Sequence, residues 1–328
     1  MRVLVAGAAG AIGERLVPRL IAEGHEVVAT TRSAAKIERL RGMGAEPVVM
    51  DGLDAVAVGE VVAKAHPEVV IHQMTALTGA GNLRRFDHEF AATNDLRTRG
   101  TDNLLAAAVG AGVRRIVVAS FTGWPNIRVG GPVKTEKDPL DPRPPAAQHR
   151  SLAAIAHLEK VVPAAREIEG LVLRYGIFYG PGSSNELFTR VRKRALPLVG
   201  DSGGVWSFIH VDDAAAATVA ALRNGTPGGI YNIVDDDPAP LSEWLPFLAE
   251  AVGAKPPRRV PVWLARIVGG EVAVSMTTRI RGSSNARARD ELGWTPQRAS
   301  WRQGFPETER TNRAAPGGTA AAKDAEQR

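Results

Sequence analysis

A glycine-punctuated turn follows the first apolar segment and constrains the fold more than any other feature of the chain. Residues 1–6 read Met-Arg-Val-Leu-Val-Ala, an apolar, β-branched run typical of a buried strand in a parallel sheet. An amphipathic helix is expected directly after the turn, from Ile12 to Glu23. Glycines permit the tight turn, and the helix N-terminus directs its N–H groups at a bound pyrophosphate. We therefore predict a dinucleotide site that includes Gly7, Ala9, Gly10, Ala11, Ile12 and Gly13.

Strands and helices alternate through the first half of the chain. Strands are expected at 25–31, 45–50, 69–72 and 114–119, and helices at 34–41, 54–65 and 93–110. A further helix (146–167) and strand (171–174) follow a Pro-rich loop. This order predicts an α/β protein with a doubly wound parallel sheet, and a second, smaller lobe follows from about Tyr175.

The domain boundaries follow from changes in composition. Residues 1–175 are predicted to form the NAD(P)-binding Rossmann domain, to which 206–234 return. Residues 176–205 and 235–308 have denser Gly and Pro, and we assign them to the substrate lobe. Residues 309–328 are predicted to be a disordered tail, because that end of the chain is polar, small and aperiodic.

The composition argues against several other classes of protein. The 328 residues include no cysteine, which excludes disulfides and thiolate chemistry and fits a reducing cytoplasm. The net charge of +6 is dispersed and aromatic residues make up 5%, whereas a nucleic-acid-binding face needs clustered basic and aromatic side chains. No apolar stretch approaches the roughly 20 residues of a membrane span. The scattered histidines indicate no metal site.

Several later segments match one protein family in order and spacing. They are Asp51 after the third strand, the helical segment 93–105, and segments 173–182, 208–213, 231–233 and 292–296. With the glycine turn, they resemble the extended short-chain dehydrogenase/reductases of the NAD-dependent epimerase/dehydratase group over residues 1–308. The resemblance implies a Rossmann domain with a smaller C-terminal substrate lobe and a cofactor across the carboxyl edge of the sheet. It also implies a homodimer formed by helices packed side by side.

The same resemblance implies particular cofactor contacts. Asp51 would hold the adenine amine, and the backbone of Gly52 and Leu53 would border the adenine ring. Gln73 and Met74 would line the nicotinamide half. Asn94 and Arg174 lie in matching motif segments and are expected in the cofactor site as well.

The end of the second strand bears on which nicotinamide cofactor binds. An NAD site places a carboxylate on the ribose 2′-OH about 20 residues after the turn, and no acidic residue occurs between Val27 and Lys36. Arg32 suits a 2′-phosphate through its fork of donors, and Thr31 and Ser33 add hydroxyl groups. The sequence therefore favours NADP, with NAD as the alternative.

The expected catalytic helix departs from the family pattern. Carbonyl reduction in this family uses a Tyr-x-x-x-Lys pair, and none of the three tyrosines here has a lysine four residues later. If Glu159 matches the glutamate of that helix, Ser151 replaces the tyrosine and Ile155 the lysine. The substitute proton donors are then Ser151 and two histidines, His149 and His157.

Two hydroxyl groups near the end of the fifth strand are candidates for binding the substrate oxygen. Ser120 and Thr122 flank the expected position, and spacing does not decide between them. Trp124 and Trp206 are expected beside the substrate. Trp206 occupies the position of an arginine that clamps the diphosphate in nucleotide-sugar members, and an indole packs on an apolar ring instead.

Together, these features predict an oxidoreductase that transfers a hydride between NADP and a small carbonyl-, enone- or quinone-like substrate, with a nonstandard proton donor. One alternative is a noncatalytic NADP-binding sensor or assembly factor, since fold does not determine function. Another is a sugar-type epimerase or dehydratase.

Overall fold

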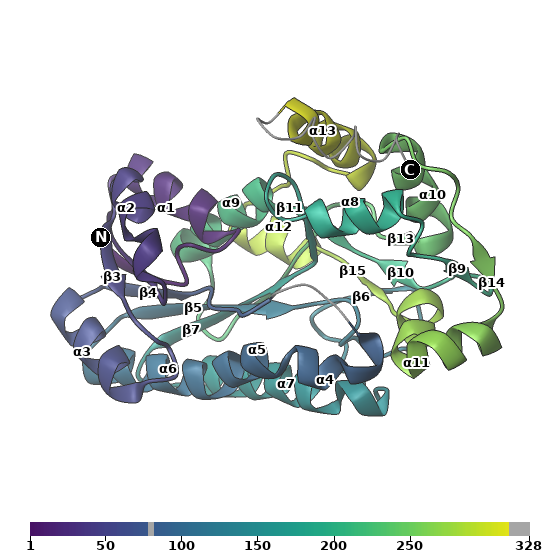
Figure 1. The fold of residues 1–328 in the computed structure, drawn as a ribbon. Helices are drawn as coiled ribbons and strands as arrows, with labels where there is room; N and C mark the ends of the chain where they lie inside the picture. Colours follow the sequence, from purple (N-terminus) through teal and green to yellow (C-terminus); the bar gives the residue numbers. More distant parts are fainter. Residues whose placement is uncertain (78–81, 315–328) are drawn as a thin grey trace.

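The computed structural model describes residues 1–77 and 82–314, and a seven-stranded parallel sheet forms its centre (Figure 1). The strands are β1 (Arg2–Ala6), β2 (Glu26–Thr31), β3 (Glu46–Val49), β4 (Val69–His72), β5 (Arg115–Phe121), β7 (Glu169–Tyr175) and β12 (Ile230–Ile233). Their order, β12-β7-β5-β4-β1-β2-β3, changes direction between β1 and β4. This confirms the predicted doubly wound sheet, in which ligands bind at the carboxyl ends of the strands near the change of direction.

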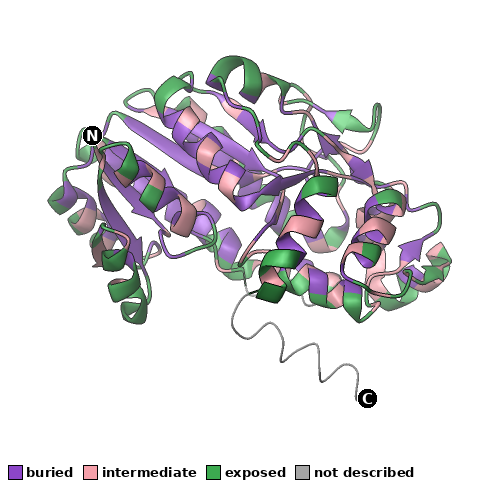
Figure 2. Ribbon diagram, turned by 90° about the horizontal axis from the view of Figure 1, so that it is seen from above, coloured by how far each residue is buried: buried purple, intermediate pink, exposed green. Residues whose placement is uncertain are grey.

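Helices cover both faces of the sheet (Figure 1). One layer contains α1 (Gly13–Ala22), α2 (Ile37–Gly42), α9 (Val211–Asn224) and α12 (Ala286–Leu292); the other contains α3 (Ala55–Ala65), α4 (Phe86–Glu89), α5 (Ala91–Asp95), α6 (Thr101–Gly110) and α7 (His149–Ala164). Strand alternation divides the core between them: Val3 and Val5 pack in one cluster, Leu4 and Ala6 in the other. The sheet is therefore buried on both faces, as the strand colours in Figure 2 show.

The helix expected at 93–110 is interrupted. Residues Leu96–Gly100 form a π-helical turn between α5 and α6. The hydroxyl of Thr98 donates to the carbonyl oxygen of Asn94 over 2.9 Å, and Gly100 lies close against Leu96. Such turns are rare and occur often at functional sites. Leu96, Arg97 and Gly100 are the buried residues of this one.

The C-terminal part of the chain contributes a second, aromatic core beside the sheet. Its main elements are β8 (Ile177–Tyr179), α8 (Asn185–Arg192), β10 (Val205–Trp206), β11 (Phe208–His210), β13 (Ala239–Pro240), α10 (Leu241–Ala251), α11 (Val262–Thr278) and α13 (Trp301–Ala314). The short pairs β6 (Val133–Lys134) with β15 (Gly282–Ser283), and β9 (Leu198–Val199) with β14 (Arg259–Val260), join its loops. Edge-to-face contacts of Phe305 with Tyr179, Phe188 and Phe208 organise this core.

The prediction of a disordered tail is wrong for residues 309–314, which complete α13. Glu309 is buried, forms an ion pair with Arg192 and accepts from Arg313 at 2.6 Å. These contacts hold the end of an amphipathic helix that composition alone did not reveal. Residues 315–328 of the predicted tail lie outside the described residues. Within the described part of the chain, no helix combines the length and apolarity needed to cross a bilayer.

Candidate functional site

The glycine turn between β1 and α1 is packed so closely that two of its glycines admit no side chain. Gly7 has a φ of +85°, and a Cβ there would lie 2.8 Å from the backbone carbonyl carbon of Gln73. A Cβ on Gly13 would lie 2.3 Å from the carbonyl oxygen of Ala8. Gly10 is different, because it is exposed and its Cβ would meet only the carbonyl oxygen of Gly7, at 3.4 Å. The turn is therefore closely packed at Gly7 and Gly13 and open to solvent at Gly10.

The N-terminus of α1 faces this open side without a side-chain cap. Ile12 occupies the N-cap position and makes no side-chain capping bond. The backbone N–H groups of Glu14 and Arg15 donate to the carbonyl oxygens of Gly10 and Ile12, whereas those of Ile12 and Gly13 make no hydrogen bond with the described residues. These two N–H groups and the positive end of the helix dipole are therefore available to an anion. The Lys36 ammonium donates to the carbonyl oxygen of Ala9 over 3.2 Å and adds positive charge beside the turn. Backbone space, donors and charge all fit a dinucleotide diphosphate.

The other predicted adenosine contacts lie at the neighbouring strand ends. Thr31 is buried at the end of β2, with its hydroxyl accepting from the backbone N–H of Ser33, while the side chain of Arg32 is exposed. Asp51 accepts from the backbone N–H of Leu53 at 3.0 Å. Because the ends of β1, β2 and β3 share one edge of the sheet, the structure brings these residues to the same side as the glycine turn.

Gly52 links this adenine side to the segment after β4. A Cβ on Gly52 would lie 2.5 Å from the sulfur of Met74, and its carbonyl oxygen accepts from the side-chain amide of Asn103 at 3.0 Å. The amide of Gln73 donates over 3.0 Å to the hydroxyl of Tyr175. Burial raises the pKa of Tyr175 to about 12. Tyr175 is therefore a structural partner of Gln73 beneath the site.

His72, the last residue of β4, is held in one neutral tautomer. Its Nδ1 accepts from the backbone N–H of Met74 at 3.1 Å, so Nε2 carries the proton toward the carbonyl oxygen of Leu96 at 3.3 Å. Burial, together with the smaller effect of the positive charge of Arg97, lowers the pKa of His72 to about 4, although the hydrogen bond to Leu96 opposes the shift. The ring thus orients the segment that is predicted to line the nicotinamide half.

This buried histidine makes the protein less stable in acid. The unfolded chain takes up a proton near pH 6.5 and the folded chain only near pH 4, so the free energy of unfolding falls as pH drops through that interval. The full contribution is at most about 3 kcal/mol. We expect His72→Asn, whose Oδ1 also accepts from Met74, to flatten this dependence in urea titrations between pH 4 and 7. Exposed His149→Asn is the control, and an unchanged slope in His72→Asn would contradict the assignment.

Ser120 and Arg174 meet through one buried carboxylate. The Ser120 hydroxyl donates to Oε1 of Glu159 at 2.7 Å. The Arg174 guanidinium donates to both oxygens of Glu159, over 2.9 and 2.6 Å. These three side chains therefore satisfy one another below the carboxyl edge, where β5, β7 and α7 meet.

Ser151 and Asn94 also lie together, in a second buried network. The Ser151 hydroxyl donates to Oδ1 of Asp87 over 2.6 Å and accepts from the side-chain amide of Asn94 at 3.0 Å. The backbone N–H groups of Arg150 and Ser151 also donate to Asp87, at 2.9 and 2.8 Å. Asp87 of α4 thus caps the first turn of α7 from outside that helix.

The remaining predicted catalytic groups lie apart from this network. Thr122 is buried, with its hydroxyl 2.6 Å from that of Ser283 and 3.2 Å from Oδ1 of Asn126. His149 is exposed, and its Nε2 lies 3.1 Å from the carbonyl oxygen of Pro144. His157 is on the outer side of α7, 2.7 Å from Asp102.

Apolar side chains fill the region between α7, the end of β5 and α11. The cluster consists of Phe86, Trp124, Leu152, Ile155, Val272 and Ile280, with Phe121, Trp206 and Met276 packed against it. Ile155 is fully buried there, and Trp124 makes an edge contact with Phe86 at 5.2 Å. The indole N–H of Trp206 donates to the carbonyl oxygen of Met276 at 3.0 Å. These side chains pack against one another, so the cluster is an apolar core beside the helix that carries Ser151.

Two charged residues near the site were not predicted from the sequence. Arg97 is only 9% exposed and shares the buried stripe of its helix with Thr93 and Thr101. Because residues four apart lie on one face of a helix, the spacing of Thr93, Arg97 and Thr101 indicates that all three face the same side. No local sequence pattern predicts the role of Asp87, because it accepts hydrogen bonds from the N–H groups of Arg150 and Ser151, more than 60 positions later in the chain.

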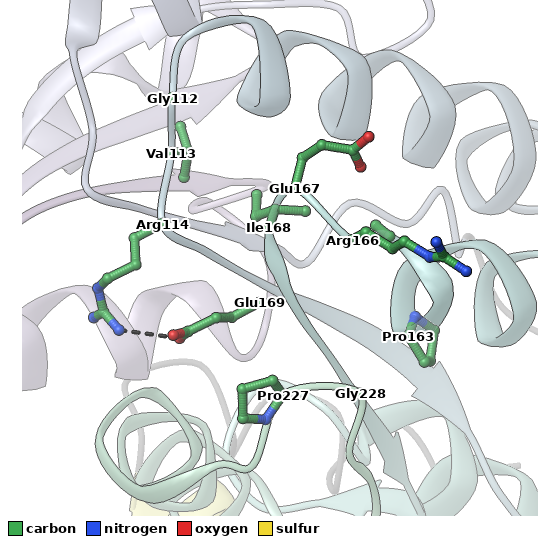
Figure 3. A pocket seen from close by; sticks show the side chains of 11 residues that line it. Gly112, Val113, Arg114, Pro163, Arg166, Glu167, Ile168, Glu169, Pro227 and Gly228 are labelled. Atoms are coloured by element: carbon green, nitrogen blue, oxygen red, sulfur yellow. Dashed lines mark hydrogen bonds and ion pairs between the residues drawn. The ribbon is translucent and has the colours of Figure 1, made fainter.

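A hollow on the opposite edge of the sheet does not belong to this site (Figure 3). It is lined by residues at the amino ends of β5 and β7, and Arg114 and Glu169 pair across it at 3.0 Å. Parallel sheets bind ligands at their carboxyl ends, whereas this hollow lies at the amino ends. We assign it no ligand.

Comparisons with known proteins agree with this geometry. The model of the NAD dependent epimerase/dehydratase family matches residues 3–234. A 3-diazoavenalumate denitrifying reductase from a Streptomyces species is 44% identical over 315 residues, covering 93% of this chain and 99% of the relative. A 2-alkyl-3-oxoalkanoate reductase from Stenotrophomonas maltophilia is 30% identical over 266 residues, covering 77% and 76%.

A solved structure shows the same fold with a cofactor. The Thermus thermophilus UDP-glucose 4-epimerase in complex with NAD is 26% identical, with a TM-score of 0.74, and the match covers 96% of this chain and 100% of the other. The family model spans most of the chain, and the sheet has the strand order of a doubly wound fold. This chain therefore belongs to the NAD dependent epimerase/dehydratase family.

Proposed function

We propose that this protein is an NADPH-dependent reductase that transfers a hydride to a small, flat, unsaturated substrate without a tyrosine proton donor. One observation carries the proposal: an open dinucleotide turn at Gly10 accompanies a helix with buried Ile155 and enclosed Ser151 at the expected positions of the Tyr/Lys pair. The names of two relatives, both reductases, support the direction of the reaction.

The chain's own residues would hold the coenzyme in an extended position along the carboxyl edge. The turn at Gly7–Gly13 would bind the diphosphate, Asp51 to Leu53 the adenine, and Gln73 and Met74 the nicotinamide half. When bound, the reduced nicotinamide supplies a hydride. The buried Glu159–Arg174 pair and the Ser120 hydroxyl are bonded to one another behind this region. We therefore propose a structural role for these three side chains.

The exposed arginine after β2 supports NADP over NAD. Arg32 makes no hydrogen bond or ion pair with the described residues, so its guanidinium is available to a 2′-phosphate. We expect Arg32→Ala to weaken NADPH binding by about tenfold or more, the effect of roughly one charge-assisted contact, and to leave NADH binding unchanged. Fluorescence titration with both coenzymes measures this. Exposed Arg41→Ala is the matched control, and an equal loss for NADH would contradict the assignment.

The chemistry of the substrate explains why the Tyr/Lys pair is dispensable. An isolated ketone becomes a strongly basic alkoxide, which needs an acid. An enone or quinone becomes an enolate or phenolate, which is a weaker base. The 44% identical relative is named for a diazo compound and for denitrification. At a diazonium carbon, the new C–H bond replaces the C–N bond, whose electron pair leaves with dinitrogen, and no oxygen needs protonation.

Of the two hydroxyls predicted to bind the substrate oxygen, Thr122 has more support. Its hydroxyl donates to Oδ1 of Asn126 over 3.2 Å and lies 2.6 Å from the hydroxyl of Ser283, where either oxygen can be the donor, so Thr122 is not bound to a carboxylate. Trp124 of the apolar cluster is two residues away. Ser120, by contrast, gives its proton to Glu159. We propose Thr122, rather than Ser120, as the hydroxyl that contacts the substrate, and water as the final proton source.

A substrate panel tests the proposed function. NADPH oxidation is measured with simple ketones, enones, quinones and ortho-diazophenols, in the wild type and in a variant that cannot bind coenzyme. We expect turnover with the conjugated or diazo compounds and little with simple ketones. Coenzyme binding without turnover on any compound would favour the noncatalytic sensor instead. Turnover of nucleotide sugars alone would favour the epimerase alternative.

A further inference from the structure

Arg97 differs from the other buried arginines in the described part of the chain. Arg115 donates to Glu169 and to the carbonyl oxygens of Ala221 and Leu222, and Arg174 donates twice to Glu159. Arg97 is buried as deeply, yet its guanidinium makes no hydrogen bond or ion pair with any described residue. A buried guanidinium without a hydrogen-bonded partner is costly, so such a group is expected to have an anionic partner that is not part of the chain.

The position of Arg97 is where hydride transfer is proposed to occur. It lies in the π-helical turn Leu96–Gly100, which packs against α7, the helix of Ile155 and Glu159. Its charge lowers the pKa of His72 at the end of β4, and the carboxylate of Glu159 on α7 in turn raises the pKa of Arg97. One turn earlier, Asn94 bonds to Ser151, at the expected tyrosine position. Arg97 therefore lies between the carboxyl ends of β4 and β5 and the helix that lacks its lysine.

The guanidinium also remains accessible to a ligand. Burial lowers the pKa of Arg97 to about 10, so it is cationic at neutral pH. None of its nitrogens is among the fully enclosed side-chain atoms without a partner, whereas Oδ1 of the adjacent Asn94 is. The remaining exposed surface of Arg97 thus includes donors that an anion can approach, with the unpartnered Asn94 oxygen nearby.

We propose that Arg97 binds the substrate oxygen on which negative charge collects when the neighbouring carbon system accepts a hydride. The ligand is an enolate or phenolate. In this step a C–H bond of the reduced nicotinamide breaks, a C–H bond forms on the substrate, and the electron pair displaced from the conjugated system collects on the oxygen. Water supplies the proton afterwards. A fixed cation in a low-dielectric site stabilises that charge as it develops, which replaces the missing tyrosine. The inference rests on the proposed reductase function.

The first test distinguishes an effect of Arg97 on catalysis from effects on folding and on coenzyme binding. We expect Arg97→Gln to lower kcat with a quinone by at least about 100-fold, the loss typical of removing one oxyanion donor. NADPH affinity should change less than about twofold, and the melting temperature should stay equal or rise because an unpaired charge is removed. Exposed Arg99→Gln on the same turn is the matched control. Unchanged kcat, or a lower melting temperature with lost coenzyme binding, would overturn the proposal.

The second test does not depend on turnover. The ionisation of para-nitrophenol is followed by its absorbance in the NADP⁺-loaded protein. We expect the bound phenol to ionise at a lower pH than in water in the wild type, and this shift to be absent in Arg97→Gln. Benzoate, tested in parallel, shows whether the site takes a carboxylate instead. Failure of the wild type to bind para-nitrophenol overturns the Arg97 proposal, whereas binding with the shift but without turnover on any substrate rejects the reductase function alone.

Discussion

Gly10→Asp is expected to abolish coenzyme binding while leaving the fold intact. A side chain at Gly10 meets only the carbonyl oxygen of Gly7, so the turn tolerates it and the free energy of unfolding should change by less than about 1 kcal/mol. The carboxylate, however, occupies the open side of the turn and repels a diphosphate at the N-terminus of α1. We expect at least a 100-fold loss of affinity, or about 3 kcal/mol.

Two further glycine variants make this test specific. Gly42→Asp, at an exposed position with no heavy atom within 4 Å of the added Cβ, should bind coenzyme as the wild type does. Gly13→Ala should instead destabilise the protein, because its Cβ would lie 2.3 Å from the carbonyl oxygen of Ala8. Calorimetric titration and thermal melting of all three variants measure both quantities. Retained affinity in Gly10→Asp would place the diphosphate elsewhere.

Glu159→Ala is expected to be the most destabilising substitution, by about 3–5 kcal/mol, because it leaves Arg174 buried and unpaired. The Glu159 and Arg174 side chains are 5% and 7% exposed, so water does not replace the lost partner. The Ser120 hydroxyl also loses its acceptor. Urea denaturation of the variant measures the loss.

The double variant Glu159→Met/Arg174→Met identifies the cause. Replacing both charges with apolar side chains removes the unpaired guanidinium, and we expect it to recover most of the stability that Glu159→Ala loses. Glu167→Ala, on the loop that follows α7, should have little effect. A double variant as unstable as Glu159→Ala would show that packing, and not the uncompensated charge, accounts for the loss.

Local patterns were sufficient to predict the fold. The apolar run at 1–6 and the glycines after it fix a strand, a turn and a helix, and the strand–helix alternation then leads to a doubly wound sheet. These signals act within about ten residues, and the packing at Gly7 and Gly13 shows why no other residue type is possible there. The end of α13 was missed because Glu309 is held by a contact with Arg192, 117 positions earlier.

The residues at the predicted cofactor edge could be located from the sequence, whereas the contacts of the predicted catalytic residues could not. Gly10, Arg32, Asp51 and Gln73 gather at one edge because each follows a strand, and strand ends can be located from sequence. Ser120, Thr122 and Ser151 form hydrogen bonds with residues far away in the chain, so the sequence does not reveal that these hydroxyl groups already have partners. Arg97 was overlooked because an arginine in a helix is normally assigned to its solvated face.

The most direct measurement is a calorimetric titration of the wild-type protein with NADPH, NADP⁺ and NADH. The account predicts saturable binding of NADPH at about one equivalent per chain, with weaker binding of NADH. The absence of binding heat for every coenzyme at millimolar concentration would contradict it.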